Sequence, residues 1–185
     1  MYQVIDNLLS KRDFNNIKDY FPTKLNWGYS NSVAGPDTDT NIKYNLDDYM
    51  FNHLFYLSDP FMISREIHLI MPIIAELNIK NFIRCKANFY SRTEEIIEHD
   101  YHVDLTDDHL VAIYYVNTNN GFTILKDHKK IESVENRLLI FDGKIEHAST
   151  SSSDGNRMNI NFNYVPNVPK GNKPDKKEFI LGNYS

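Results

Sequence analysis

The sequence predicts a mainly β protein, a β-sandwich or jelly roll buttressed by N-terminal helices. Two observations lead to this prediction. Apolar residues recur with a helical period in parts of the first 80 residues, and from residue 81 onward the period changes to two, as in strands. The strand-like segments then follow one another with turn signals at intervals of about 8 to 12 residues, which is typical of an all-β sandwich or barrel.

Two helices are expected before residue 81. Asp6 is the expected N-cap of the first, which Pro22 closes. Its apolar face consists of Leu8, Leu9, Phe14, Ile17 and Phe21. The second begins at Pro60, and Pro72 is expected to kink or split it. Residues 30–41 lie between them, and their Ser, Gly, Pro, Asp and Thr content predicts a mobile loop.

The remaining segments up to residue 165 are expected as strands. They cover residues 82–90, 111–116, 138–141, 145–148 and 157–164. The third and fourth flank Asp142-Gly143, a predicted tight turn. The last alternates strictly: its apolar face consists of Met158, Ile160, Phe162 and Tyr164, and its polar face of Arg157, Asn159, Asn161 and Asn163. A polar face of this kind is either solvated or lines a pocket.

Composition favours one soluble domain. The chain has 185 residues, of which 41% are hydrophobic and 24% charged. We expect helical support and the first strands in residues 1–80, the core in 81–165 and a C-terminal extension in 166–185. Net charge is −5 without a broad basic face, so no nucleic-acid partner is expected. No leader-like start or apolar run of about 18 residues indicates a membrane role.

The single cysteine, Cys85, excludes an internal disulfide framework and fits a reducing compartment. Its place on the apolar face of segment 82–90 indicates a small core residue rather than a nucleophile. We expect a cytoplasmic protein, in the host cytoplasm if it is phage-encoded, that is a monomer or a weak dimer.

An H-x-D motif points to metal chemistry. His102 and Asp104 lie two residues apart, so an extended strand directs both side chains to one side. His147, just past the predicted turn, is the natural third ligand. Two His and one carboxylate leave three coordination positions open for exogenous ligands, as in non-haem iron(II) oxygenases.

Arg157 follows on the next predicted strand and has no acidic neighbour on its own face. A buried arginine that no protein carboxylate pairs is costly. A ligand carboxylate can supply the missing bidentate partner. We therefore expect a carboxylate ligand near the metal.

Six motifs resemble the prolyl-4-hydroxylase type of the 2-oxoglutarate/iron(II) dioxygenase superfamily, in particular short members from bacteria and from phages of cyanobacteria. They are H-V-D at 102–104, I-Y-Y-V-N at 113–117, G-F-T at 121–123, R-L-L-I-F-D at 137–142, E-H at 146–147 and R-M-N-I-N-F at 157–162. They cover residues 80–165 in order. The resemblance implies a double-stranded β-helix (jelly roll) and one oxygenase domain over residues 1–185.

The resemblance also implies the cofactors and their residues. Iron(II) is expected at His102, Asp104 and His147, and Arg157 is expected to bind the C5 carboxylate of 2-oxoglutarate. O₂ is the second co-substrate, and ascorbate supports turnover. Further contacts to 2-oxoglutarate are expected from Tyr115, Tyr90 and Asn161.

Two departures from the family pattern concern the substrate. Asn163 replaces a tryptophan that such hydroxylases carry, and Asn120-Gly121-Phe122-Thr123 replaces Gly-Gly-x-Thr. Asn163 also lies where DNA-repair demethylases of the superfamily carry a second arginine, which disfavours that subgroup. The resemblance implies hydroxylation of a prolyl residue in a peptide or protein. A free amino acid or another small molecule is the alternative, and a non-catalytic jelly-roll binding module also stays open.

Other residues near the H-x-D motif receive simpler interpretations. His99 and His109 lack a carboxylate two residues on, so both are expected as surface polar residues. Glu94 to Glu98 is expected as a solvated loop. Residues 30–41 and 91–98 are the candidates for mobile segments that form the entrance to the site.

Overall fold

The structure, a computed structural model, describes residues 2–33, 49–126 and 129–167. Its strands are β1 (Tyr2–Ile5), β2 (Gly28–Ser30), β3 (Met50–Leu57), β4 (Met62–Ile63), β5 (Ile79–Tyr90), β6 (Leu110–Tyr115), β7 (Phe122–Leu125), β8 (Lys129–Glu132), β9 (Arg137–Asp142), β10 (His147–Ser149) and β11 (Arg157–Pro166). The helices are α1 (Lys11–Lys24), the 3-10 helix η1 (Arg65–Leu69) and α2 (Met71–Glu76). None of the helices in these described ranges is both long and apolar enough to cross a membrane.

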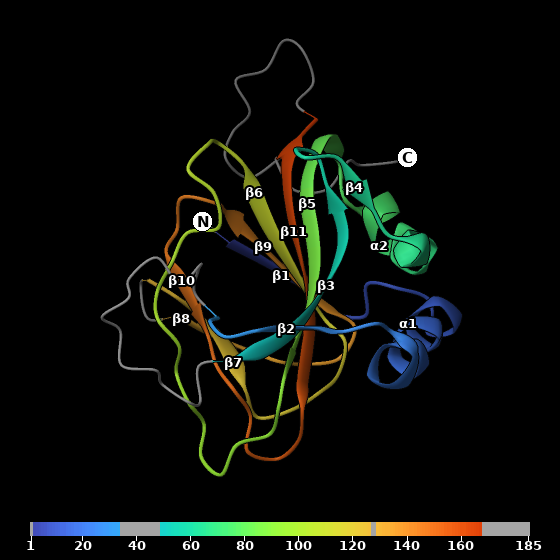
Figure 1. Cartoon of the computed structure of the whole chain (residues 1–185). Coiled ribbons are helices and arrows are strands. Elements are labelled where there is room, and N and C mark those ends of the chain that lie inside the picture. Colours follow the sequence, from blue (N-terminus) through green and yellow to red (C-terminus); the bar gives the residue numbers. More distant parts are fainter. Residues whose placement is uncertain (1, 34–48, 127–128, 168–185) are drawn as a thin grey trace.

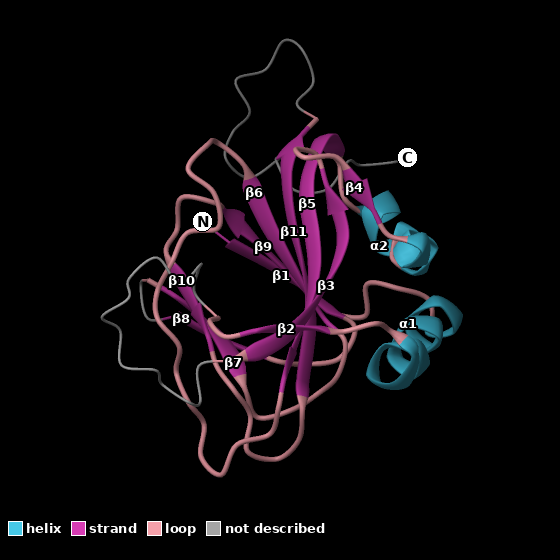
Figure 2. Cartoon of the chain, in the orientation of Figure 1, coloured by secondary structure: helices cyan, strands magenta, loops and turns pink. Residues whose placement is uncertain are grey.

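The described strands form two antiparallel sheets. The large sheet has the order β1-β9-β6-β11-β5-β3-β2, with β4 paired to β3, and the small sheet has the order β10-β7-β8. Figure 1 shows α1 and α2 together on one side of the large sheet, and β7, β8 and β10 on the other side. Figure 2 shows how strongly strands dominate. The predicted fold class, a jelly roll buttressed by helices, is confirmed.

Two apolar layers hold these parts together. The first lies between the helices and the large sheet, and it includes Phe21 of α1, Ile73 of α2 and Ile160 of β11. The second joins the two sheets and includes Val111 of β6, Leu125 of β7 and Phe141 of β9. β11 is buried over most of its length because it lies in the middle of the large sheet, between β6 and β5.

The ladder between β11 and β5 sets the faces of both strands. Arg157 pairs with Tyr90 and Asn163 with Arg84, and the register is regular between these two pairs. The next pair joins Tyr164 to Phe82, so Ile83 is left over as a bulge in β5. The alternation predicted for β11 is confirmed, and so is the apolar position predicted for Cys85 on β5. Met158, Ile160, Phe162 and Tyr164 belong to the helix-side layer, and Cys85 and Ala87 lie there with them.

The first helix begins later than predicted. Its N-cap is Ser10, whose side chain accepts a hydrogen bond from the Asp13 backbone N–H. Asp6 is not the cap, because residues 2–5 pair with β9 and Asp6 forms an ion pair with Arg137. Pro22 does not close the helix either, since α1 continues to Lys24.

The predicted second helix is split. Residues 62–63 form β4, and a 3-10 turn precedes α2, in which Pro72 lies in the first turn. A proline is tolerated there because its missing N–H would have no intrahelical partner. The expected kink or split at Pro72 is therefore confirmed, while the start at Pro60 is wrong.

The segments around Asp142-Gly143 are not a hairpin. β9 pairs with β1 and β6 in the large sheet, whereas β10 pairs with β7 in the small sheet. The tight turn at this point therefore carries the chain from one sheet to the other, and it delivers His147 to the space between them.

His99 and His109 are buried, with exposed fractions of 7% and 5%, so their assignment to the surface is wrong. The His99 ring stacks on Tyr90 with ring centroids 5.7 Å apart. The His109 ring lies under Gly143, where an added Cβ would come within 2.3 Å of it. Both positions depend on contacts between distant segments, which local sequence does not reveal.

Candidate metal centre

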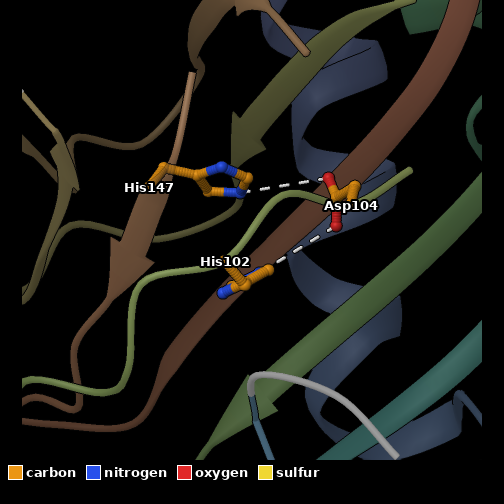
Figure 3. A group of neighbouring side chains, drawn as sticks. All are labelled: His102, Asp104 and His147. Carbon is orange, nitrogen blue, oxygen red and sulfur yellow. Dashed lines mark ion pairs between the residues drawn. The ribbon is translucent and has the colours of Figure 1, made fainter. Parts of the chain in front are cut away.

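His102, Asp104 and His147 converge in the space between the sheets. One potential ligand atom of each lies within 4.8 Å of the others. Figure 3 shows both imidazoles directed at the two oxygens of one carboxylate. His102 Nε2 lies 4.0 Å from Asp104 Oδ1, and His147 Nε2 lies 3.9 Å from Asp104 Oδ2. These separations leave room for an ion that all three residues could contact at about 2 Å.

Backbone pairing places the two histidines side by side. His102 and His147 exchange two backbone hydrogen bonds, 3.0 and 2.9 Å long, and their ring centroids lie 4.7 Å apart. This bridge is isolated, so His102 and Asp104 do not lie in a regular strand as predicted. The extended backbone around the bridge is sufficient to direct both side chains inward.

Each imidazole is oriented by its second nitrogen. His102 Nδ1 lies 3.2 Å from the Asp100 carbonyl oxygen, and His147 Nδ1 lies 3.3 Å from the Ile145 carbonyl oxygen. A carbonyl accepts only, so each Nδ1 must carry the proton and each Nε2 presents a lone pair to the centre. This is the arrangement that metal-binding histidines normally adopt.

Asp104 is held by three donors. Arg84 donates to Oδ1 at 2.8 Å, and the amides of Asn161 and Asn163 both donate to Oδ2 at 2.9 Å. Arg84 also donates to the Asn163 side-chain oxygen at 2.9 Å, which ties two of the donors together. The orientation of the carboxylate is therefore fixed before any metal arrives.

The electrostatics keep Asp104 ionised. Burial raises its pKa, but His147, Arg84 and the two amides lower it by more, so the pKa lies well below its usual range. Burial lowers the pKa of His147 despite the opposing effect of Asp104. At neutral pH His147 is therefore neutral, as a metal-binding imidazole must be, and Arg84 with the two amides maintains the carboxylate charge.

Arg157 is fully buried at the start of β11. Its guanidinium donates to Ser133 Oγ at 2.9 Å, to the Thr150 carbonyl oxygen at 3.3 Å and to Thr123 Oγ1 at 3.1 Å. It also lies over the rings of two tyrosines, 5.2 Å from the centroid of Tyr90 and 5.8 Å from that of Tyr115. No carboxylate in the described part of the chain forms an ion pair with Arg157, so its charge lacks a counter-ion.

A narrow inner cavity of about 30 Å³ connects the triad with the surroundings of Arg157. Its lining includes His102, Asp104 and His147 as well as Tyr90 and Thr123, which both contact Arg157. Three buried polar atoms of lining residues have no hydrogen-bond partner: Asn88 Oδ1, Ser149 Oγ and Asn161 Oδ1. Buried polar atoms are normally paired, so these unpaired atoms fit a site built for a polar ligand.

Gly121 allows Arg157 to take its place. A Cβ at this position would lie 2.5 Å from the Ser151 carbonyl oxygen and 2.7 Å from Arg157 Cδ. The glycine of the N-G-F-T segment is therefore required by close packing against the arginine.

The structure brings the sequence-predicted residues together at one site, although not all in the expected way. Tyr115 reaches the cavity through Thr123, to which its hydroxyl donates at 2.8 Å. Asn161 lines the cavity but uses its amide to hold Asp104. Tyr90 lines the cavity directly.

Sequence reasoning missed Arg84 and Lys86 as site residues. Both lie on the polar face of β5, and both line a wider basin outside the inner cavity. The signal was present, because the same face carries Asn88 and Tyr90. Asn163 was noticed only for the residue that it replaces, whereas it contacts both Arg84 and Asp104.

The expected entrance segments differ in their relation to the site. Residues 30–33 line the basin, and the rest of segment 30–41 lies outside the described residues. Residues 91–98 line neither the inner cavity nor the basin. They run beside residues 149–152 instead, with hydrogen bonds such as Thr93 N–H to the Ser152 carbonyl oxygen at 3.0 Å.

Comparisons by sequence find no matching protein-family model and no matching curated protein. Solved structures do match. A prolyl hydroxylase from Trichoplax adhaerens, solved with a peptide fragment of the hypoxia inducible factor oxygen degradation domain, superposes with a TM-score of 0.61 at 15% identity. The match covers 89% of this chain and 83% of that one.

Two further structures agree. A viral collagen prolyl hydroxylase from Paramecium bursaria Chlorella virus-1, in complex with 2-oxoglutarate, has a TM-score of 0.57 at 14% identity over 90% of this chain and 96% of that one. An oxidoreductase of the 2-oxoglutarate/iron(II) oxygenase family from Burkholderia pseudomallei has a TM-score of 0.58 at 10% identity over 89% and 84%. The chain thus has the jelly-roll fold of the 2-oxoglutarate- and iron(II)-dependent oxygenases, prolyl hydroxylases among them.

Proposed function

We propose that the chain is an iron(II)- and 2-oxoglutarate-dependent dioxygenase that hydroxylates an unactivated C–H bond. One observation carries the proposal. The His102, Asp104 and His147 triad lines the same cavity as Tyr90 and Thr123, which contact a fully buried arginine that has no carboxylate partner among the described residues. A metal and a carboxylate ligand together would complete both ends of this arrangement.

In this proposal His102, Asp104 and His147 hold iron(II) through two Nε2 atoms and one carboxylate oxygen. Arg157 binds the C5 carboxylate of 2-oxoglutarate. Thr123 Oγ1 accepts hydrogen bonds from both the Tyr115 hydroxyl and Arg157, and so helps to hold the arginine in place. Asn88 and Ser149 offer their unpaired atoms to the remaining polar groups.

Bound iron(II) and 2-oxoglutarate would supply the oxidising chemistry: one atom of O₂ enters the substrate C–H bond, and the other enters succinate as 2-oxoglutarate loses CO₂. The chain contributes ligand geometry and shielding. Tyr90 and Ile113 line the inner cavity, and Arg84 keeps Asp104 ionised.

A prolyl residue in a peptide or protein is the first candidate substrate, supported by the prolyl hydroxylases among the structural neighbours. A free amino acid is the second candidate. It is favoured by Asn163, Arg84 and Lys86, since these polar residues lie around Asp104 and could interact with polar groups of a substrate.

An anaerobic titration with iron(II) and then 2-oxoglutarate tests the reaction class without a substrate. We expect a metal-to-ligand charge-transfer band that requires both additions. Its absence with a folded protein would instead favour a non-catalytic binding module on the same fold.

His102→Ala, Asp104→Ala and His147→Ala are each expected to abolish iron binding while the domain stays folded, since the scaffold packs independently of the metal. Metal content after loading and dialysis measures the first effect, and circular dichroism the second. The exposed His68 provides the control, because His68→Ala should bind one iron per chain as the wild type does. Unchanged iron content in all three site variants would refute the assignment.

A further inference from the structure

A basin of about 330 Å³ lies outside the inner cavity. Its polar lining includes His102 and Asp104 of the metal centre, Arg84 and Lys86 of β5, and Ser30, Ser32 and Asn52. His102, Asp104 and Lys86 line the inner cavity as well, so the basin leads directly to the metal centre. Its volume is in the range of sites for small molecules rather than for a folded partner.

Among the described residues that line this basin, none forms an ion pair with Lys86. It forms no ion pair or hydrogen bond with any residue in the described part of the chain, although its neighbours on the same face of β5 are all engaged. Burial lowers the pKa of Lys86 to about 8, Arg84 adds to this effect, and Asp104 opposes it. An ammonium group that is partly withdrawn from water and left unpaired is unfavourable unless a ligand supplies negative charge.

The other charged residues of the site do not supply negative charge to Lys86. Arg84 already pairs with Asp104, and Asp104 is the one carboxylate among the described residues that line the inner cavity or the basin. The described lining and its contacts therefore carry three cations, Arg84, Lys86 and Arg157, against one anion. A divalent metal ion and the doubly charged 2-oxoglutarate cancel each other in charge, so this excess persists in the loaded protein.

We propose that the substrate is a small molecule bearing a carboxylate, which Lys86 binds at the base of the basin while Ser30, Ser32 and Asn52 contact its other polar groups. This inference rests on the proposed function and narrows its substrate to acids such as free amino acids. Peptides without a nearby carboxylate lack the group that would pair with Lys86. Because Lys86 also borders the inner cavity, the carboxylate of 2-oxoglutarate is the second possible source of the same chemistry, and the test separates the two.

The first arm compares matched compounds. Free amino acids and small dicarboxylates are assayed beside their primary amides and beside proline peptides with both ends blocked, by succinate formation and by calorimetry on the nickel-loaded protein with 2-oxoglutarate. We expect at least one acid to bind and to raise succinate formation, with its amide at least about tenfold weaker. Activity with blocked proline peptides and none with any acid would overturn the inference and leave the reaction class intact.

The second arm replaces the lysine. Lys86→Met is expected to weaken binding of the acid by about 30-fold or more, because it removes the cation from a partly buried charge pair. Affinity for 2-oxoglutarate, measured by calorimetry without substrate, should stay within about threefold of wild type, and Lys86→Arg should recover part of the acid binding. Lys80→Met, at an exposed lysine of the same strand, is the matched control and should change neither affinity.

The possible failures are distinguishable. If Lys86→Met weakens 2-oxoglutarate binding and spares the acid, the carboxylate belongs to the co-substrate and the inference is wrong. If no acid binds to the loaded wild type, the inference is also wrong. If the wild type binds no 2-oxoglutarate at all, the proposed function fails first.

Discussion

The two arginines at opposite ends of the site have opposite surroundings. Arg84 on β5 is partly exposed and pairs with Asp104, whereas Arg157 on β11 is fully buried and pairs with no described carboxylate. Both belong to the same ladder, in which Arg84 lies opposite Asn163 and Arg157 opposite Tyr90. Arg157 and Asn163 are six residues apart in sequence, which corresponds to about 20 Å along the strand.

The two arginines differ in whether the described chain provides their anionic partner: Arg84 has one in Asp104, and Arg157 has none. At the Arg84 end, the chain supplies both charges, and the pair orients the carboxylate proposed to bind the metal. At the Arg157 end, the described part of the chain supplies one charge and three neutral acceptors but no carboxylate. A buried cation that the fold leaves unpaired thus indicates a ligand site more directly than a pair that the fold completes.

The largest expected effect is the loss of 2-oxoglutarate affinity in Arg157→Met, with little change in stability. Removal of the cation should weaken 2-oxoglutarate binding by at least about 100-fold, because the ligand carboxylate loses its charged partner in a buried site. The free energy of unfolding of the metal-free protein should change by only about 1 kcal/mol, since no charge pair is broken. Calorimetry and urea denaturation measure the two effects. Unimpaired 2-oxoglutarate binding would remove the basis of the comparison.

Arg84→Met should instead lower the stability of the metal-free protein. The metal-free protein is expected to lose about 2 kcal/mol of stability, because Asp104 stays buried without its cation; partial solvent exposure of Arg84 limits the loss. Nickel loading should reduce this difference, since the metal ion supplies the missing positive charge.

The control for Arg84→Met is Arg12→Met at an exposed arginine that pairs with Asp13. Its effect should stay within about 0.5 kcal/mol with or without metal. Equal losses for Arg84→Met in metal-free and nickel-loaded protein would mean that Arg84 acts by packing alone.

The smallest effect is expected for Tyr115→Phe. Its hydroxyl donates to Thr123, which also accepts from Arg157, so its loss should weaken 2-oxoglutarate binding by about fivefold, the value of one hydrogen bond. The neighbouring Tyr114 provides the control. Its hydroxyl donates to Asn136 on the helix side of the sheet, and Tyr114→Phe should leave 2-oxoglutarate affinity unchanged. Equal effects of both variants would exclude a specific role for Tyr115.

The parts of the site that follow from local alternation could be predicted from the sequence. The period of two in β5 and β11 separates the polar face from Cys85 and Ile160, and H-x-D needs only extended backbone. The start of α1 was mispredicted because residues 2–5 form a strand only through pairing with β9, a contact across more than 130 residues. Asp6 has the chemistry of a cap, but that pairing commits it elsewhere.

The roles of Arg84, Lys86 and Asn163 needed the fold for the same reason. Asn163 was assigned correctly to the polar face of its strand, yet nothing local indicates that Arg84 meets Asp104, which comes from a segment outside the regular strands. The burial of His109 likewise depends on the absence of a side chain at Gly143.

The bulge at Ile83 determines which face of β5 each residue before Arg84 occupies. Without it, Phe82 would share the face of Arg84 and leave its stack on Tyr56, whose ring centroid lies 4.6 Å away. The skipped residue reverses the parity of β5 at the point where the polar face ends. A one-residue insertion or deletion between Arg84 and Tyr90, where the register is regular, would turn the site residues on one side of the change toward the helices, whereas the register is already interrupted at Ile83.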